Sequence, residues 1–165
     1  MCSSISNELI FAGSVQEEVG LRGAKTLATF VKPDIAIILE GPPADDTPGF
    51  SFQESQGKLG EGVQIRMFDP SAIGNPRLAR LAIDTATEHD IPFQVAVRRG
   101  GGTDAGAFHL ANHGIPCLVL GVPARYIHSH NSIINIEDYF AMLSLTIALA
   151  EKLDEPTVDS LTRFL

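Results

Sequence analysis

The sequence contains no tryptophan, two tyrosines and two cysteines among its 165 residues. Two cysteines cannot form the disulfide framework of a small secreted domain, and Cys117 lies in an apolar run that indicates a buried, inert thiol. Unbroken apolar stretches such as residues 35–39 are far too short to span a bilayer. The first residues lack the basic and apolar regions of a signal peptide. We therefore expect a cytoplasmic protein with no membrane partner.

Basic residues are few and scattered. The chain has 12 Lys and Arg residues against 20 Asp and Glu residues, a net charge of −8, and Arg98 and Arg99 form its only adjacent basic pair. Nucleic-acid binding needs clustered basic side chains that neutralise phosphates, so this composition excludes a nucleic-acid partner. The length and the 44% hydrophobic content indicate one folded domain with a sizeable core.

Apolar runs of strand length alternate with segments of helical period. This alternation predicts an α/β sandwich with a largely parallel sheet, in which ligands bind beyond the carboxyl ends of strands. Asn75 is expected to cap the second helix, and Ile136, Phe140, Leu143 and Ile147 mark the last one. The expected strands are 9–15, 35–39, 62–68, 93–97 and 117–121, and the expected helices are 19–31, 76–85, 105–113 and 136–150.

Two adjacent carboxylates, Glu17 and Glu18, lie where an expected strand gives way to a helix. Neighbouring side chains of an extended chain point in opposite directions, so the two are suited to different roles. One could bind a metal ion while the other acts as a base on metal-bound water. The alternative is an acidic first turn that favours the helix dipole.

Glu40 ends the apolar run 35–39, at the rim of the sheet where a metal ligand would lie, although it is also an ordinary way to end a strand. It opens a long segment, residues 40–61, that is rich in Gly, Pro and Asp. Loops of this length are usually functional or mobile. Asp45 and Asp46 within it are expected in a solvated turn.

A glycine-rich run, residues 100–102, follows an expected strand and leads through Thr103 and Asp104 into a helix. Glycines let a backbone approach closely, and a helix start offers N–H groups to an anion. The spacing is not that of a dinucleotide fingerprint, and no Lys follows the glycines as in a phosphate loop. Asp104 could equally be a helix N-cap.

Two histidines, His128 and His130, follow the strand 117–121 and would share one side of an extended chain. Histidine is a common zinc ligand. A surface position is the alternative for a histidine in a loop. His109 and His113 have the spacing of a helical zinc pair, but the HExxH pattern is absent.

Four segments, in this order, resemble the tetrahedral aminopeptidases, a family that includes glutamyl and deblocking aminopeptidases: VQEEVGLRGA (15–24), ADDTPG (44–49), GGTDAGA (101–107) and RYIHS (125–129). The resemblance covers nearly the whole chain. It implies a three-layer α/β/α, zinc-peptidase-like domain around a largely parallel, mixed sheet. It also implies two divalent metal ions, zinc or cobalt, with short peptides as substrates and a homo-oligomeric assembly.

The resemblance also assigns roles to residues, motif by motif. Glu17 matches the general base, and Glu18 and His128 match ligands of one metal ion. Glu40 matches an acidic ligand of the second metal ion, which is often Asp in the family. The segment that lines the substrate cleft is matched by Gly102, Thr103 and Asp104.

The family carries further parts ahead of the glutamate pair: a His ligand of the second metal, an Asp that bridges both metals and an inserted domain for oligomer formation. No histidine or aspartate precedes Glu17 in this sequence. The resemblance therefore implies that residues 1–165 form only the carboxyl-terminal part of a metallopeptidase catalytic domain. We expect this chain to be inactive by itself.

Three functions remain open at this point. The first is a metal-dependent aminopeptidase, and the second is a non-catalytic remnant or binding module. The third, a glycoside hydrolase, would use Glu17 and Glu40 across a sugar, but the lack of tryptophan leaves little surface for sugar stacking. For the first, we expect Glu17, Glu18, Glu40 and His128 around one cleft at the carboxyl edge of the sheet, with Asp104 nearby.

Overall fold

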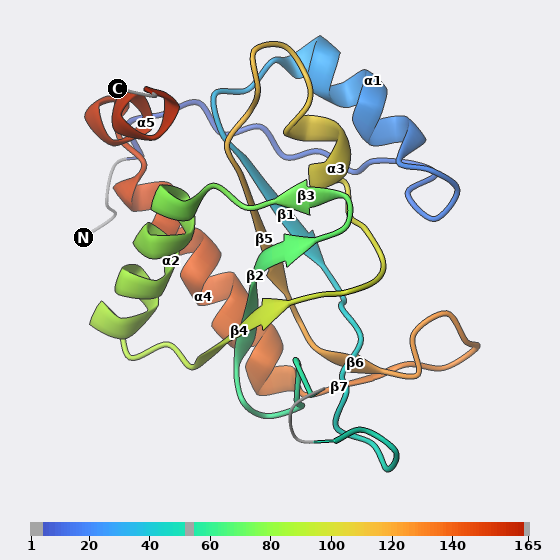
Figure 1. Cartoon of the computed structure of the whole chain (residues 1–165). Coiled ribbons are helices and arrows are strands. Elements are labelled where there is room, and N and C mark those ends of the chain that lie inside the picture. Colours follow the sequence, from blue (N-terminus) through green and yellow to red (C-terminus); the bar gives the residue numbers. More distant parts are fainter. Residues whose placement is uncertain (1–4, 52–54, 164–165) are drawn as a thin grey trace.

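The computed structural model describes residues 5–51 and 55–163 (Figure 1). Five strands form one sheet: β1 (Ala36–Glu40), β2 (Val63–Asp69), β3 (Ala72–Ile73), β4 (Phe93–Val97) and β5 (Cys117–Gly121). Their order is β1-β5-β2-β3, and β4 pairs with the other side of β2. A separate hairpin pairs β6 (Ala124–Arg125) with β7 (Ile133–Ile134). The helices are α1 (Arg22–Val31), α2 (Pro76–Glu88), α3 (Ala105–Phe108), α4 (Ile136–Lys152) and α5 (Glu155–Thr162).

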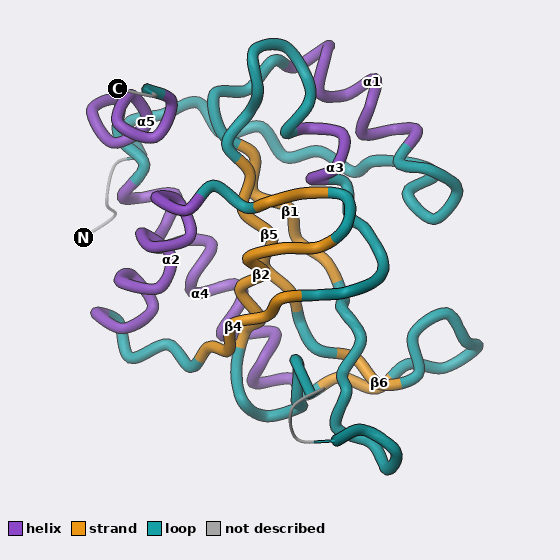
Figure 2. Tube along the Cα trace, in the orientation of Figure 1, coloured by secondary structure: helices purple, strands orange, loops and turns teal. Residues whose placement is uncertain are grey.

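The sheet is mixed. β1 runs parallel to β5, and β2 runs parallel to β4, but β2 runs antiparallel to β5. One core lies between the sheet and helices α2 and α4, and a second core lies between the opposite face and helices α1 and α3. Figure 2 shows helices on both sides of the strands. The predicted α/β/α sandwich around a mixed sheet is thus confirmed.

Helix α2 forms where the sequence predicts it. The side chain of Asn75 accepts hydrogen bonds from the N–H groups of Arg77 and Leu78, and Pro76 occupies the first turn. An N-cap bond of this kind satisfies amide groups that lack a partner at a helix start. Leu78 and Ala82 are fully buried against the sheet. The N-cap at Asn75 and the burial of Leu78 and Ala82 therefore both favour a helix at these residues.

Two expected elements differ from the structure, and one helix was not expected. Residues 9–15 form no strand; Phe11 is 91% exposed, and no strand among the described residues pairs with this segment. α3 ends at Phe108 rather than at residue 113. α5 was not predicted, although Asp154 caps it by accepting the N–H of Thr157.

Helix α4 has the expected position but buries a different face. Its buried residues include Ala141, Leu145 and Leu149, whereas Phe140 and Ile147, which mark it in the sequence, are about half exposed. A helix that is apolar all round has no single face for periodicity to identify. Within the described residues, no helix is long and apolar enough to cross a membrane.

Candidate active site

A tight turn ahead of α1 presents the glutamate pair. The carbonyl oxygen of Glu17 accepts the N–H of Leu21 at 3.0 Å, and Gly23 donates its N–H to the carbonyl of Val15 at 2.8 Å. A Cβ at Gly23 would lie 2.5 Å from that oxygen, so the turn closes only because residue 23 has no side chain. α1 has no acidic residue in its first turn. The helix-dipole alternative for the pair is therefore wrong.

Glu18 and His128 lie side by side. The Oε1 atom of Glu18 is 3.0 Å from the Nε2 atom of His128, and each side chain is about two-thirds exposed. His128 and Tyr126 have left-handed backbones, with φ values of 58° and 63°. The chain turns here, so the extended conformation that would place His128 and His130 on one side is wrong. The structure nevertheless brings together the two side chains assigned to one metal ion.

Glu40 ends β1 and forms a largely buried ion pair. Its register partner on β5 is Gly121, where a Cβ would lie 2.4 Å from the ring of Pro42. The Nη2 atom of Arg66, on β2, lies 2.5 Å from the Oε1 atom of Glu40. Burial raises the pKa of Glu40 to about 7, although the charge of Arg66 opposes that rise. Glu40 is therefore partly protonated near neutral pH, and a bound cation would favour its charged form.

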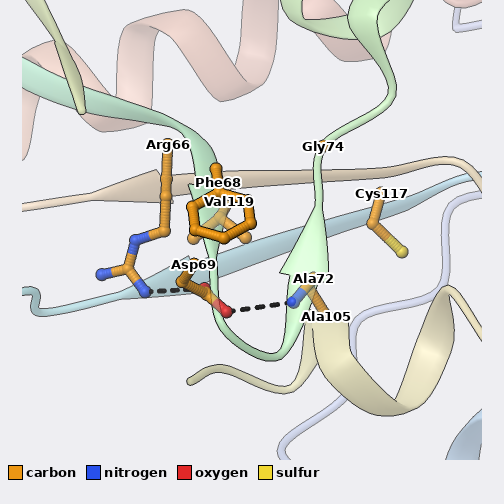
Figure 3. A pocket seen from close by; sticks show the side chains of 8 residues that line it. All are labelled: Arg66, Phe68, Asp69, Ala72, Gly74, Ala105, Cys117 and Val119. Carbon is orange, nitrogen blue, oxygen red and sulfur yellow. Dashed lines mark hydrogen bonds and ion pairs between the residues drawn. The ribbon is translucent and has the colours of Figure 1, made fainter. Parts of the chain in front are cut away.

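Asp69 binds the other terminal nitrogen of Arg66, Nη1. Its Oδ2 atom accepts a hydrogen bond from Arg66 at 3.2 Å, and its Oδ1 atom accepts the N–H groups of Ser71 and Ala72. Figure 3 shows Asp69 between Arg66 and the amide of Ala72, beside a small buried cavity. These bonds fix the guanidinium in a direction that reaches Glu40.

The cavity has a volume of about 10 Å³, enough for at most one water molecule. It is too small to be a substrate pocket. Cys117 lines it, and burial raises the pKa of this thiol to about 12. The prediction of a buried thiol is confirmed.

The glycine-rich loop packs against Ser71. The N–H of Thr103 donates to the Oγ atom of Ser71 at 3.2 Å, and a Cβ at Gly102 would lie 3.0 Å from Ser71. Asp104 accepts a hydrogen bond from Ser14 and makes no N-cap bond to α3. Asp104 occupies the N-cap position of α3, as the alternative predicted, although its side chain makes no capping hydrogen bond. Ser14 lies in the segment that leads to the glutamate pair, so this bond ties the loop to that segment.

Glu17 interacts electrostatically with these groups. Its pKa is raised, first by burial and then by the charges of Glu18 and Asp104, while His128 and Arg66 lower it. The charge of Glu17 in turn helps to raise the pKa of Glu40. Glu17 is thus within electrostatic reach of all four other predicted site groups. A carboxylate with a raised pKa binds a proton more readily, as a general base must.

We expected the site residues to lie together at the carboxyl edge of the sheet, but the strands that lead to them end together only in part of the sheet. β1 and β5 end together, but β4, which leads into the loop 100–104, joins the sheet through the antiparallel strand β2. Contacts over the α1 side of the sheet, such as that of Asp104 with Ser14, connect the loop to the glutamate pair instead.

Asp45 and Asp46 do not lie in a solvated turn, contrary to the prediction. Asp45 is buried and forms an ion pair with Arg98, and Asp46 accepts two hydrogen bonds from Arg125, at 2.7 and 2.8 Å. These bonds hold the pKa of Asp46 below its usual value. Arg125 belongs to the same short segment as His128. The hydrogen bonds between Asp46 and Arg125 therefore connect the ADDTPG and RYIHS motifs.

The family model of the M42 glutamyl aminopeptidases matches residues 2–145, most of the chain. The chain belongs to the M42 glutamyl aminopeptidase family. The residues brought together here thus lie in a domain that this family shares.

Individual relatives of this M42 chain agree with the family assignment. The glutamyl aminopeptidase of Lactococcus lactis is 42% identical over 156 residues, which are 94% of this chain and 42% of that enzyme. The TET aminopeptidase from a marine sediment Thaumarchaeota archaeon superposes with a TM-score of 0.89 and 41% identity, over 91% of this chain and 42% of its own. A Thermotoga maritima protein described as an endoglucanase superposes with a TM-score of 0.65 and 31% identity, over 90% of this chain and 41% of its own. The M42 chain spans less than half the length of each.

The described residues do not complete a metal site by themselves. The M42 family implies divalent metal cofactors, but no group of three or more His, Cys, Asp or Glu side chains is arranged to hold an ion in the part of the chain that the structure describes. Zinc sites use three or four protein ligands. Glu18 and His128 supply two, and Glu40 is engaged by Arg66.

Sequence reasoning missed the buried charges that support the site. Arg66 and Asp69 both lie in β2, and both are at least 94% buried. The available signal was an arginine three residues before an aspartate, in a strand that also contains Gln64. That spacing alone does not distinguish a surface pair from a buried one.

Proposed function

We propose that this chain is the carboxyl-terminal part of the catalytic domain of a metal-dependent aminopeptidase, which releases amino-terminal residues from short peptides. The observation that supports this most is the 3.0 Å pair of Glu18 and His128, with Glu17 and its raised pKa beside it. In the proposal, Glu17 is the general base. Glu18 and His128 bind one divalent ion, zinc or cobalt, and Glu40 binds a second.

Glu17 would perform the proton transfers. Its carboxylate takes a proton from the attacking water and delivers it to the leaving amine, a role that its raised pKa supports. Divalent ions bound by the complete site would supply Lewis-acid polarisation of the scissile carbonyl. Gly102 and Asp104 would line the substrate cleft, where the exposed glycines leave the backbone open to a peptide, and the fully buried Thr103 would hold the loop in place.

The complete activity requires more than this chain. The missing parts would be a histidine ligand of the second ion, an aspartate that bridges both ions, and the domain through which the complete enzyme forms a homo-oligomer. We propose that the 165 residues alone are inactive and that the complete enzyme works in the cytoplasm.

The test is hydrolysis of aminoacyl-nitroanilides. This chain would be co-expressed with the part of the Lactococcus lactis glutamyl aminopeptidase that precedes the region matched by this chain. We expect metal-dependent release of nitroaniline, and Glu17→Gln should lower the rate by about 10²- to 10⁴-fold, the usual contribution of a general base. Glu137→Gln, at an exposed position on α4, is the matched control and should retain full activity. Equal rates for the two variants would refute the role of Glu17.

The second candidate is a non-catalytic remnant or binding module. It is favoured by the absence of a three-ligand metal group among the described residues. A remnant would stay inactive when the missing segment is supplied, so the same assay separates the two functions. The glycoside hydrolase stays the weakest candidate, because its second carboxyl group, Glu40, is occupied by Arg66.

A further inference from the structure

Asp69, at the end of β2, is a buried carboxylate with two separate sets of partners (Figure 3). Its Oδ2 atom accepts a hydrogen bond from the Nη1 atom of Arg66 at 3.2 Å. Its Oδ1 atom accepts three hydrogen bonds: from the N–H groups of Ser71 and Ala72, at 2.8 and 3.1 Å, and from the hydroxyl group of Ser71, at 2.6 Å. A buried carboxylate is tolerated only where such partners replace its hydration. The two oxygen atoms therefore bind two different parts of the structure.

The Oδ2 atom leads, through Arg66, to Glu40. The Nη2 atom of Arg66 lies 2.5 Å from the Oε1 atom of Glu40, and its Nη1 atom binds Asp69. Within the described residues, the buried Nε atom of Arg66 has no hydrogen-bond partner. The direction of the guanidinium therefore depends on its two terminal nitrogens. Because a guanidinium is planar and rigid, fixing Nη1 also fixes where Nη2 points.

The Oδ1 atom leads, through Ser71, to the glycine-rich loop. A serine hydroxyl has one proton to donate and lone pairs to accept with. Ser71 donates its proton to Asp69, so the lone pairs of its Oγ atom are left for the N–H of Thr103, which lies at 3.2 Å. The loop also approaches Ser71 at two glycines: an added Cβ would lie 3.0 Å from it at Gly102 and 2.8 Å from it at Gly106. Asp69 therefore sets the direction of the hydroxyl group that binds the loop.

We propose that Asp69 is a positioning residue that acts on both halves of the candidate site. Through Arg66 it holds Glu40, and through Ser71 it holds the loop 100–104. These two halves follow β1 and β4, which are not neighbours in the sheet, so one carboxylate at the end of β2 fixes their relative position. The contacts of Asp69 are independent of the proposed function, whereas their importance for catalysis rests on it.

Three substitutions separate the two sets of contacts. Asp69→Asn keeps an oxygen atom for Ser71 and Ala72 but places an amide group, which is a donor, against the donors of Arg66. Ser71→Ala removes the acceptor of the Thr103 N–H and leaves the bond between Asp69 and Arg66 in place. Asp69→Ala removes both sets of contacts.

Two signals in NMR spectra of the isotope-labelled chain report on the two sets. The terminal nitrogens of a guanidinium that is held at both ends give separate signals, and these signals merge when the group rotates freely. Arg66 is the group to follow, and Arg98, which forms an ion pair with Asp45, is the internal reference. The loop is followed by the deuterium exchange rate of the Thr103 amide, divided by that of the Ala36 amide, which donates to the carbonyl of Pro116. Global unfolding would speed up both amides equally, so this ratio isolates the loop.

The unaltered chain should give separate signals for the terminal nitrogens of Arg66. Asp69→Asn should merge them and change the exchange ratio by less than about 2-fold, since the bonds to Ser71 are kept. Ser71→Ala should keep the Arg66 signals separate and raise the ratio about 10-fold, the effect of losing one hydrogen bond. Asp69→Ala should merge the signals and raise the ratio as well.

Four results would overturn the positioning role of Asp69: merged Arg66 signals in the unaltered chain, separate signals in Asp69→Asn, an unchanged ratio in Ser71→Ala, or identical effects of Asn and Ala at residue 69. If Asp69→Ala does not fold, Asp69→Asn and Ser71→Ala still decide the matter. Neither signal depends on peptide hydrolysis. The positioning role can therefore fail while the aminopeptidase proposal stands, and the aminopeptidase proposal can fail while the positioning role stands.

Discussion

At the scale of single residues, the site depends on charges held in unusual surroundings. Glu40 has lost most of its hydration, and Arg66 does not fully offset that loss, so its pKa rises from 4.5 to about 7. A carboxyl group with a raised pKa binds its proton more tightly in the folded state than in the unfolded state. The stabilisation is therefore complete below pH 4.5 and is lost as the pH rises through 7.

Glu40→Gln should make stability less dependent on pH. The shift corresponds to at most about 3 kcal/mol at 1.36 kcal/mol per unit. Urea unfolding at several pH values should show that the unfolding free energy of the unaltered chain, minus that of the variant, falls by up to this amount between pH 4.5 and 8. Glu137→Gln, at an exposed position, should leave the difference flat. If the difference in unfolding free energy between the unaltered chain and Glu40→Gln does not change with pH, the burial of the Glu40 carboxyl group is contradicted.

The proposed catalytic and metal-binding residues lie in short motifs that are visible in the sequence, whereas the residues that contact them from distant strands could not be predicted. Glu17 and Glu18 are adjacent in sequence, and RYIHS contains both His128 and Arg125. Arg66 reaches Glu40 across β5, a contact between residues that are 26 positions apart and on non-neighbouring strands. The order of apolar and polar residues along one strand carries no information about a contact with a distant strand.

At the scale of elements, the turn ahead of α1 depends on one glycine. Gly→Ala in a helix normally adds up to about 1 kcal/mol of stability. At Gly23, the added Cβ would meet the backbone nitrogen and oxygen of Val15 at 2.5 Å, so the backbone must shift. We expect Gly23→Ala to lower the unfolding free energy by about 1–3 kcal/mol, as overpacking does.

Gly100→Ala is the control for this turn, because no atom lies within 4 Å of a Cβ there. Its unfolding free energy in urea should stay within about 0.5 kcal/mol of the unaltered chain. Similar effects for both substitutions would mean that the close approach of Gly23 to Val15 does not hold the turn.

Most regular elements could be predicted because their apolar pattern and caps act locally. β4 and β5 have the predicted bounds, and Asn75 caps α2 as expected. Residues 9–15 were wrongly assigned to a strand because an apolar run does not show whether a partner strand exists. The direction of β2 relative to β5 also depends on distant contacts rather than on local sequence.

At the scale of the whole molecule, the chain has two metal-ligand candidates at one position and one at the other. Calorimetric titration with zinc should show no tight, stoichiometric binding, because stable sites use three or four protein ligands. His128→Ala should abolish the weak binding that remains, and Ala substitution of the exposed His113 should not. Tight binding of two ions per chain would mean that other side chains, such as His130 or Asp46, complete the sites.

The most direct test of the account is aminopeptidase activity of the 165 residues alone. Aminoacyl-nitroanilides would be incubated with the chain and an excess of zinc or cobalt, with and without a chelator. We predict no release of nitroaniline, because in the proposed mechanism Glu17 needs further groups to hold the nucleophile and the substrate amine, and orientation supplies several kcal/mol of such a barrier. Robust, chelator-sensitive turnover by this chain alone would contradict the account.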